Sequence, residues 1–193
     1  EHCVSEMITG IDLVEQQILV ARGEKLKFSQ NDLKINGHAI ELRICAEDPL
    51  NNFMPDTGSL DVYRRPQGEG IRIDDGYEEG MAIPIYYDPM IAKLVVHAPT
   101  RIEAIQKMIK AIKDYKIEGV ITTMPFGIFV MEHEAFVSGM FDTHFVKNYY
   151  TPEKIKDKQR ANAEAAALVA LRYWQDKQKI LAPVQHKSTS WKR

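Results

Sequence analysis

The stretch from Gly37 to Pro49 constrains the fold of this chain more than any other segment. Apolar residues alternate in it with other types, at the two-residue period of a β-strand. One face of that strand should point into a core and carries Ile40, Leu42 and Ile44. The other face would hold Glu41 and Arg43 between small neighbours, which leaves room for a ligand. The spacing alone nevertheless favours a solvated ion pair, which would contribute only about 0.2–1 kcal/mol.

The composition limits the kinds of function that this chain can have. With 193 residues and a net charge of −2, it has the size of one domain, or of one domain with an appendage. Because there is no strong charge, no transmembrane-length apolar run and no signal-peptide pattern, we expect neither a nucleic acid nor a membrane as partner. Cys3 and Cys45 are interpreted as free thiols in a reducing compartment, the cytoplasm.

The order of the expected elements indicates an α+β domain, in which helices cover a largely antiparallel sheet. Residues 1–5 are expected to be extended, and an amphipathic helix should begin near Ile11. Thr100 and Glu103 have the spacing of a capping box and should begin a helix that lies on the sheet. Another helix is expected at 126–133. Further strands are predicted at 59–65, 71–74, 92–97 and 119–122.

Two parts of the chain are expected, an α+β domain at 1–150 and a helical extension at 151–193. The extension has an alanine-rich helical segment at 161–178 and a polar tail at 185–193. The chain begins with Glu1 and not with methionine. Because its first segment also reads as the middle of a motif, we expect it to be a piece of a longer protein.

Motifs of self-contained metal or catalytic sites are missing from the sequence. There is no Cys-x-x-Cys, His-x-x-x-His or His-Glu-x-x-His, so no metal ligand set is expected. Neither a Gly-x-Ser-x-Gly elbow nor a Walker loop occurs. Residues 66–70 contain Gly-Glu-Gly without the third glycine of a dinucleotide loop, and we interpret them as a hairpin turn between 59–65 and 71–74. His97 is predicted to be structural and His133 to lie at the surface.

Four motifs follow one another in an order that rarely arises by chance. They are Glu-His-x-Val-Ser-Glu-Met-Ile-Thr-Gly-x-Asp-Leu-Val at 1–14, Gly-His-Ala-Ile-Glu-x-Arg-Ile-x-Ala-Glu-Asp-Pro at 37–49, Phe-x-Pro-x-x-Gly at 53–58 and Tyr-Tyr-Asp-Pro-Met-Ile-Ala-Lys-Leu at 86–94. In these four motifs the chain resembles the C-terminal part of the biotin carboxylase family. The resemblance extends over residues 1–150 and implies that family's C-terminal domain fold.

The resemblance implies an ATP-grasp enzyme of acetyl-CoA, propionyl-CoA or pyruvate carboxylases, with ATP, Mg²⁺ and biotin as cofactors. In that family ATP converts bicarbonate to carboxyphosphate, which releases carbon dioxide for the deprotonated ureido nitrogen of biotin. Glu1 matches the general base that acts on bicarbonate. Arg43 matches the arginine that stabilises the enolate-like biotin intermediate, and Glu41 would support Arg43.

Other positions follow from the same resemblance. Thr143 and His144 match residues beside the adenine edge of ATP. Arg72 fits a homodimer interface, in which Glu69 stands where the bacterial acetyl-type enzymes have an aromatic residue. Thr123 replaces an asparagine at a position to which the family assigns no chemistry. A biotin carboxyl carrier protein or domain and a carboxyltransferase component are the implied partners.

The family's glycine-rich lid, ATP-binding lysines and magnesium ligands would precede Glu1, so we expect the chain alone to fold without hydrolysing ATP. Two other interpretations stay open. One is the equivalent domain of another ATP-grasp carboxylase, against which the His-Ala-x-Glu-x-Arg strand argues. The other is an oligomerisation or docking module without an active site, in which Arg43 only pairs with Glu41.

Overall fold

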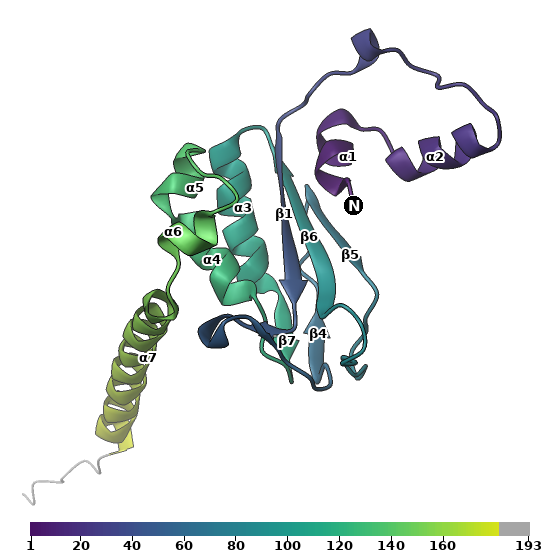
Figure 1. Ribbon diagram of the computed structural model, residues 1–193. Coiled ribbons are helices and arrows are strands. Elements are labelled where there is room, and N and C mark those ends of the chain that lie inside the picture. Colours follow the sequence, from purple (N-terminus) through teal and green to yellow (C-terminus); the bar gives the residue numbers. More distant parts are fainter. Residues whose placement is uncertain (182–193) are drawn as a thin grey trace, which may run out of the picture. The chain divides into compact units, whose positions relative to one another are not determined.

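A three-stranded antiparallel sheet is the centre of this protein (Figure 1). The computed structural model describes residues 1–181, and the chain divides into two compact units after Pro152. The sheet belongs to the first unit and has the strand order β1-β6-β5. Its strands are β1 (His38–Cys45), β5 (Ile71–Asp75) and β6 (Met90–Ala98). The predicted α+β class with an antiparallel sheet is confirmed.

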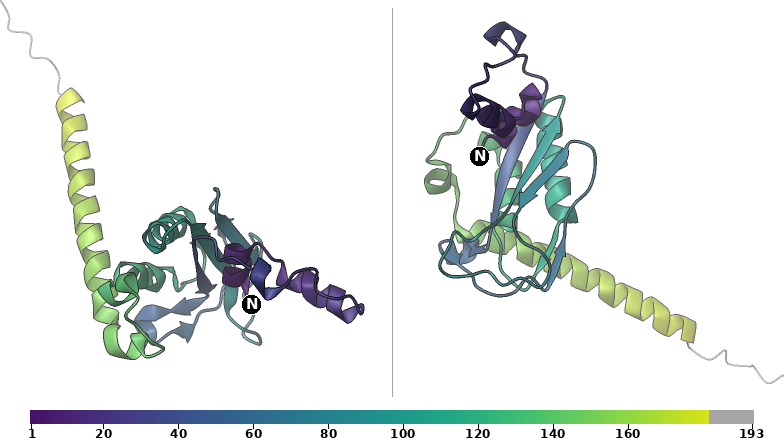
Figure 2. Two further views of the ribbon diagram at one scale, coloured as in Figure 1. Left: turned by 90° about the horizontal axis from the view of Figure 1, so that it is seen from above. Right: turned by 90° about the vertical axis from the view of Figure 1, so that its right-hand side faces the viewer.

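Helices cover this sheet on both sides (Figures 1 and 2). One side carries α3 (Arg101–Asp114), α4 (Met124–Glu132), α5 (Glu134–Ser138) and α6 (Phe145–Tyr149), and the other side carries α1 (Cys3–Thr9). The capping box that the sequence predicts is present, because the Thr100 side chain accepts from the Glu103 amide and the Glu103 carboxylate accepts from the Thr100 amide. This box satisfies two backbone donors that the first turn of a helix leaves without partners.

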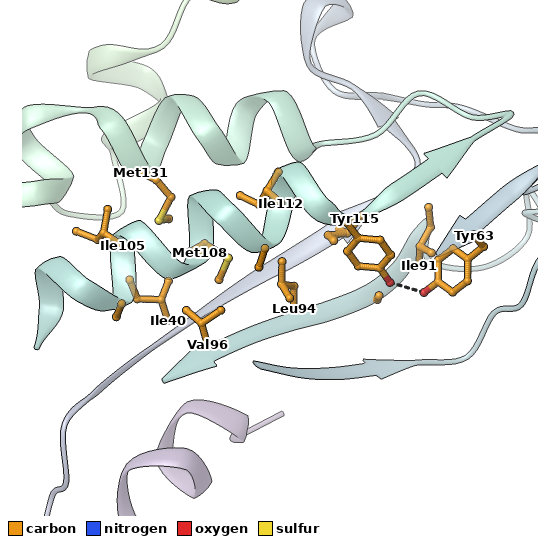
Figure 3. Close-up of a cluster of buried hydrophobic side chains, with 14 of the residues drawn as sticks. Ile40, Tyr63, Ile91, Leu94, Val96, Ile105, Met108, Ile112, Tyr115 and Met131 are labelled. Carbon is orange, nitrogen blue, oxygen red and sulfur yellow. Dashed lines mark hydrogen bonds between the residues drawn. The ribbon is translucent and has the colours of Figure 1, made fainter. Parts of the chain in front are cut away.

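The core lies between the sheet and α3 (Figure 3). Leu94 and Val96 of the central strand and Met108 of α3 are fully buried in it. At one end of the core the Tyr63 hydroxyl donates to Asp75 at 2.7 Å and lies 2.6 Å from the Tyr115 hydroxyl. Tyr63 has a single proton, so Tyr115 must donate to it. Burial is the main reason that the pKa of Tyr115 rises to about 12.

The predicted hairpin turn at residues 66–70 is wrong. β4 (Val62–Arg64) pairs with β7 (Lys116–Glu118), whereas β5 pairs with β6. Two strands that follow each other in the sequence therefore belong to different sheets. A strand of three residues carries too little pattern to specify its partner, and the packing of Tyr63 against Tyr115 beside β7 decides the pairing.

The predicted strand at residues 119–122 is also wrong. β7 ends at Glu118, and Gly119 follows with a φ of +97°, which lies outside the range of a β-strand. A Cβ on Gly119 would collide with the backbone oxygen of Ser59, so that only glycine allows the two segments to approach so closely. The chain then continues directly into α4.

Residues 3–5 form the start of the helix α1 and are not extended as predicted. The helix α1 has seven residues, of which only Cys3 is buried, so it shows no readable periodicity. Gly10 ends it in a left-handed conformation with a φ of 72°. The next helix, α2 (Leu13–Ala21), begins after Asp12, whose side chain accepts from the Glu15 amide at 2.8 Å.

The remaining elements are short or belong to the second unit. They are the 3₁₀ helices η1 (Gln30–Asp32) and η2 (Pro49–Asn51), the paired strands β2 (Glu47–Asp48) and β3 (Met54–Pro55), and the long helix α7 (Pro152–Leu181). α7 begins earlier than the predicted helix at 161–178, and the predicted polar tail at 185–193 lies outside the described residues. Among the described helices, none is long and apolar enough to cross a membrane.

Two histidines contribute to packing within the first unit. The His97 Nε2 lies 2.7 Å from the Asn36 carbonyl oxygen, which agrees with its predicted structural role. His133, which was predicted to lie at the surface, is half-buried. Its Nδ1 accepts from the Ala135 amide at 3.2 Å, and its ring lies 4.7 Å from that of Tyr149. His133 therefore caps α5 and packs among aromatic rings, which the sequence does not reveal.

Candidate functional site: the polar face of the sheet

Three charged residues form a row across one face of the sheet. Arg43 of β1 lies directly opposite Lys93 of β6, and Lys93 lies directly opposite Asp74 of β5. Directly opposed residues in antiparallel strands project from the same face. The alternation that predicts a polar face on β1 thus continues over all three strands. We call Arg43, Lys93 and Asp74 the charged row.

Arg43 is largely open to solvent. Its side chain is 60% exposed, while that of Glu41 on the same strand face is 14% exposed. Its Nε donates to the Glu41 Oε1 at 3.4 Å, a long contact that orients the guanidinium without covering it. The remaining donors of Arg43 point to no protein group in the described chain, so they are free to contact an anionic ligand.

A network of charged groups holds α1 against the polar face. The Arg72 Nη1 donates to the Glu6 Oε2 of α1 at 2.6 Å, and its Nε donates to the Asp74 Oδ1 at 2.8 Å. The Cys3 thiol donates to the Asp74 Oδ2 at 3.1 Å. Burial, and then the bond to Asp74, raises the pKa of Cys3, so the thiol keeps the proton that it donates. Arg72 thus acts within this chain, and its place in a dimer interface stays a prediction.

A cavity of about 320 Å³ opens between α1, α2 and two members of the charged row, Lys93 and Asp74. Glu1 lines it together with Arg72, Asp74 and Lys93. The structure therefore places Glu1 and two cationic side chains around one space, and Arg43 is the cross-strand neighbour of Lys93. Glu6 also lines the cavity, and Arg72 is paired with Glu6 and Asp74, so Lys93 is the cation that a small anion would meet beside the Glu1 carboxylate.

Thr143 and His144 are not brought to this cavity. They precede α6, on the side of the sheet opposite to α1 (Figure 1). The His144 amide donates to the Asp142 Oδ1 at 2.8 Å, and the His144 Nδ1 lies 3.5 Å from the same oxygen. Both residues are exposed, so a ligand can reach them, and their contact with the adenine of ATP stays a prediction.

Sequence reasoning missed Lys93 and Asp74 as parts of the site. Both lie in strands that were predicted, but the pairing register that aligns them with Arg43 depends on three strands distant in the sequence. The alternation within β1 was the only available signal. Within the described residues, no group of three or more His, Cys, Asp or Glu side chains could hold a metal ion.

Replacing Asp74 with asparagine should remove stability that depends on pH. The bond from Arg72 is the largest reason that the pKa of Asp74 lies below its usual value, so the folded state binds its proton less well than the unfolded state. This stability is present above the unfolded pKa of about 3.9 and is lost as the pH falls through the folded pKa. The difference in Tm between the two proteins should therefore be constant from pH 7 to about pH 5 and shrink below about pH 4.

Thermal unfolding at each pH measures this difference, and Asp142→Asn at an exposed loop position is the matched control. A Tm difference for Asp74→Asn that stays the same at pH 3 would contradict the assignment.

Comparison with known proteins defines the class to which this domain belongs. The family model described as "Biotin carboxylase C-terminal domain" matches residues 41–148, more than half of the chain. The chain therefore belongs to the biotin carboxylase C-terminal domain family, as predicted.

Its relatives are biotin carboxylases and the corresponding subunits of larger carboxylases. The chain is 48% identical to biotin carboxylase 1 of Bacillus subtilis over 149 residues, which cover 77% of this chain and 33% of the relative. The biotin carboxylase subunit of a pyruvate carboxylase has a TM-score of 0.77 and 46% identity, over 80% of this chain and 34% of that chain. The biotin carboxylase domain dimer of Hydrogenobacter thermophilus 2-oxoglutarate carboxylase, in complex with MgADP, ADP and bicarbonate, has a TM-score of 0.75 and 44% identity, over 77% and 33%. The chain thus spans about a third of the length of these relatives.

Proposed function

We propose that this chain is the C-terminal part of an ATP-dependent biotin carboxylase, a ligase that uses ATP and bicarbonate to carboxylate biotin on a carrier protein. The observation that carries this proposal is the polar face of the sheet, where Glu1 lines a cavity next to the charged row that includes Arg43. Membership of the family and the likeness to a domain that binds MgADP and bicarbonate support it.

Glu1 would take the proton of bicarbonate as a general base. A carboxylate can do this if the anion is held close to it, within hydrogen-bond distance. The cavity that Glu1 lines also contains Lys93, whose positive charge would attract the anion, whereas Arg72 is already paired with Glu6 and Asp74 in the same lining. The deprotonated bicarbonate then attacks the terminal phosphate of ATP, which yields carboxyphosphate and ADP.

Arg43 would stabilise the negative charge that develops on the ureido oxygen of biotin when its nitrogen attacks carbon dioxide. A guanidinium stays charged at any working pH and offers several donors in a fixed plane. Its exposure leaves these donors accessible to a biotin that is presented from outside the domain. Glu41, which is mostly covered, would keep the guanidinium in this orientation.

Thr143 and His144 would contact the adenine of ATP from the loop before α6. Mg²⁺ has no ligand set among the described residues, so we assign no step in this chain to it. In the proposed enzyme the ion that accompanies ATP would be held by residues of the parent protein outside this chain.

The proposed partners follow from the reaction. A biotin carboxyl carrier protein or domain would present biotin, and a carboxyltransferase component would receive the carboxyl group. Arg72 and the segment around Glu69 would contribute to a homodimer. The dimer formed by the related 2-oxoglutarate carboxylase domain supports this proposal. The two free cysteines, Cys3 and Cys45, favour a reducing compartment, which we propose to be the cytoplasm.

A second candidate function is an oligomerisation or docking module without a reaction of its own. The observation in its favour is that Arg43 contacts the Glu41 carboxylate, as a simple surface ion pair would. In this case the loss of Arg43 would affect assembly and leave the chemistry intact.

The proposal is tested with the full-length protein that contains this chain. It should carboxylate free biotin and cleave ATP only when bicarbonate is present, and the chain of 193 residues alone should show neither activity. Product formation from ¹⁴C-bicarbonate and release of phosphate measure the two activities. A full-length protein without biotin-dependent fixation of bicarbonate would refute the proposal. ATP cleavage by the chain alone would refute the division of the site between this chain and the rest.

A further inference from the structure

Thr123 is a buried polar residue that the proposed reaction does not use. It stands immediately before α4 and is only 6% exposed. A threonine at the N-terminus of a helix usually accepts a hydrogen bond from the first turn. Thr123 makes no such bond, and Pro125 in that first turn has no amide hydrogen to donate. The hydroxyl of Thr123 is therefore available for another partner.

That partner is β1, at the residues on each side of Ile44. The Thr123 hydroxyl donates to the Arg43 carbonyl oxygen at 3.2 Å and accepts from the Cys45 amide at 3.0 Å. The Thr123 amide donates to the Cys45 carbonyl oxygen at 3.0 Å. One residue, about 80 positions away in the sequence, thus holds the backbone of β1 just beside Arg43.

These bonds are made at the open edge of β1. β1 is the outer strand of the sheet β1-β6-β5, so strand pairing holds it on one side only, and its register with β6 shifts between Ile44 and Cys45. A strand edge that is not paired can bend or slip, which would change the direction of the Arg43 side chain. The bonds to Thr123 replace the missing strand partner at this position.

The contact between α4 and β1 is close enough to transmit this constraint. A Cβ on Gly127 of α4 would lie 2.6 Å from the Leu42 Cδ2 of β1, so a larger residue there would force the Leu42 side chain to move. Leu42 therefore packs directly on the helix backbone, and the backbone of residues 43–45 bonds to the residue that begins the helix. Helix and strand are held together on both sides of Arg43.

From this geometry we infer that Thr123 is a positioning residue, which sets the direction of the Arg43 guanidinium toward biotin through the backbone of β1. This inference rests on the proposed function. Thr123 touches neither biotin nor bicarbonate in it. Its effect is confined to the step that needs Arg43, the reaction of biotin, and the cleavage of ATP with bicarbonate does not depend on it.

The test uses Thr123→Val in the full-length protein, because valine keeps the shape of threonine and removes both hydrogen bonds of the hydroxyl. Misplacing a catalytic group by a fraction of an ångström should lower kcat for biotin carboxylation about tenfold to a hundredfold. The rate of bicarbonate-dependent ATP cleavage should change by less than about twofold, because a mutation that affects only the biotin step does not alter the rate of the ATP step. Thr123→Ser keeps the hydroxyl and should restore kcat to within about twofold.

Thr122→Val is the matched control. Thr122 is as buried as Thr123, but its hydroxyl makes no hydrogen bond to β1 within the described chain. The same chemical change at this position should therefore leave the ratio of the two activities unchanged. If Thr123→Val lowers both activities equally, or if serine does not restore the rate, Thr123 has a general structural role and the inference is overturned.

Amide hydrogen exchange in the chain itself separates this inference from the proposed function. In Thr123→Val the Cys45 amide should exchange about tenfold faster than in the original chain, because its acceptor is gone. Unchanged exchange would overturn the inference whatever the enzyme does. Faster exchange in a chain whose full-length parent does not carboxylate biotin would support the contact and refute the proposed function alone.

Discussion

Replacing Arg43 with alanine in the full-length protein should lower the rate of biotin carboxylation about 10²–10³-fold, the usual loss when a donor to a developing oxyanion is removed. The guanidinium is exposed and pairs only with Glu41 at 3.4 Å, so its loss should change the free energy of unfolding by less than about 0.5 kcal/mol. Carboxylation of free biotin at saturating ATP measures the rate, and urea unfolding measures the stability.

Two controls make this result specific. Arg43→Lys keeps the charge but not the planar arrangement of donors, and it should recover only part of the rate. Arg22→Ala removes an arginine outside the polar face, at the end of α2, and should leave the rate unchanged. If carboxylation survives Arg43→Ala while the oligomeric state changes in sedimentation, the docking module is the correct function.

Replacing Leu94 with alanine should cost the first unit about 2–5 kcal/mol of unfolding free energy, the range measured when large core side chains are truncated. Leu94 is fully buried at the centre of β6, the strand that pairs with both of its neighbours and packs on α3. A domain of this size is typically stable by only about 5–15 kcal/mol, so the variant should unfold at a clearly lower urea concentration.

The measurement needs a signal from the first unit. Both tryptophans of the sequence come after Pro152 and so lie outside the first unit. Tyrosine absorbance, which includes the buried pair Tyr63 and Tyr115, is therefore the better probe. Ile35→Ala is the control, because Ile35 is exposed and its truncation should change stability by less than about 0.5 kcal/mol. A cost below about 1 kcal/mol for Leu94→Ala would contradict the assignment of the core.

The parts of the fold that the sequence predicted well are those with a strong local signal. The alternation in β1 predicted its core-facing residues, of which Ile40 and Ile44 are buried and Leu42 packs against the core. The capping box of Thr100 and Glu103 predicted where α3 begins. Both patterns involve residues only a few positions apart, so they can be recognised in the sequence without knowledge of the tertiary structure.

The wrong predictions concern segments whose structure depends on distant partners. The short strand β4 pairs with β7 and not with the strand next to it in the sequence, because Tyr63 packs on Tyr115. α1 is a helix because Glu6 and Cys3 bond to Arg72 and Asp74 on β5, which no pattern within seven residues can reveal. In each case a contact over many residues outweighs a weak local preference.

The sequence by itself determined the family, the class of fold, and the residues Arg43, Glu41 and Glu1 as candidates for the site. Tertiary structure alone decided how these candidates are arranged, because the register of three strands aligns Arg43 with Lys93 and Asp74, and the packing of α1 creates the cavity that Glu1 lines. It also decided the role of Thr123, whose bonds to β1 join residues about 80 positions apart. Alternation and capping are local properties of a chain, whereas register and helix packing exist only when distant segments meet in the folded state.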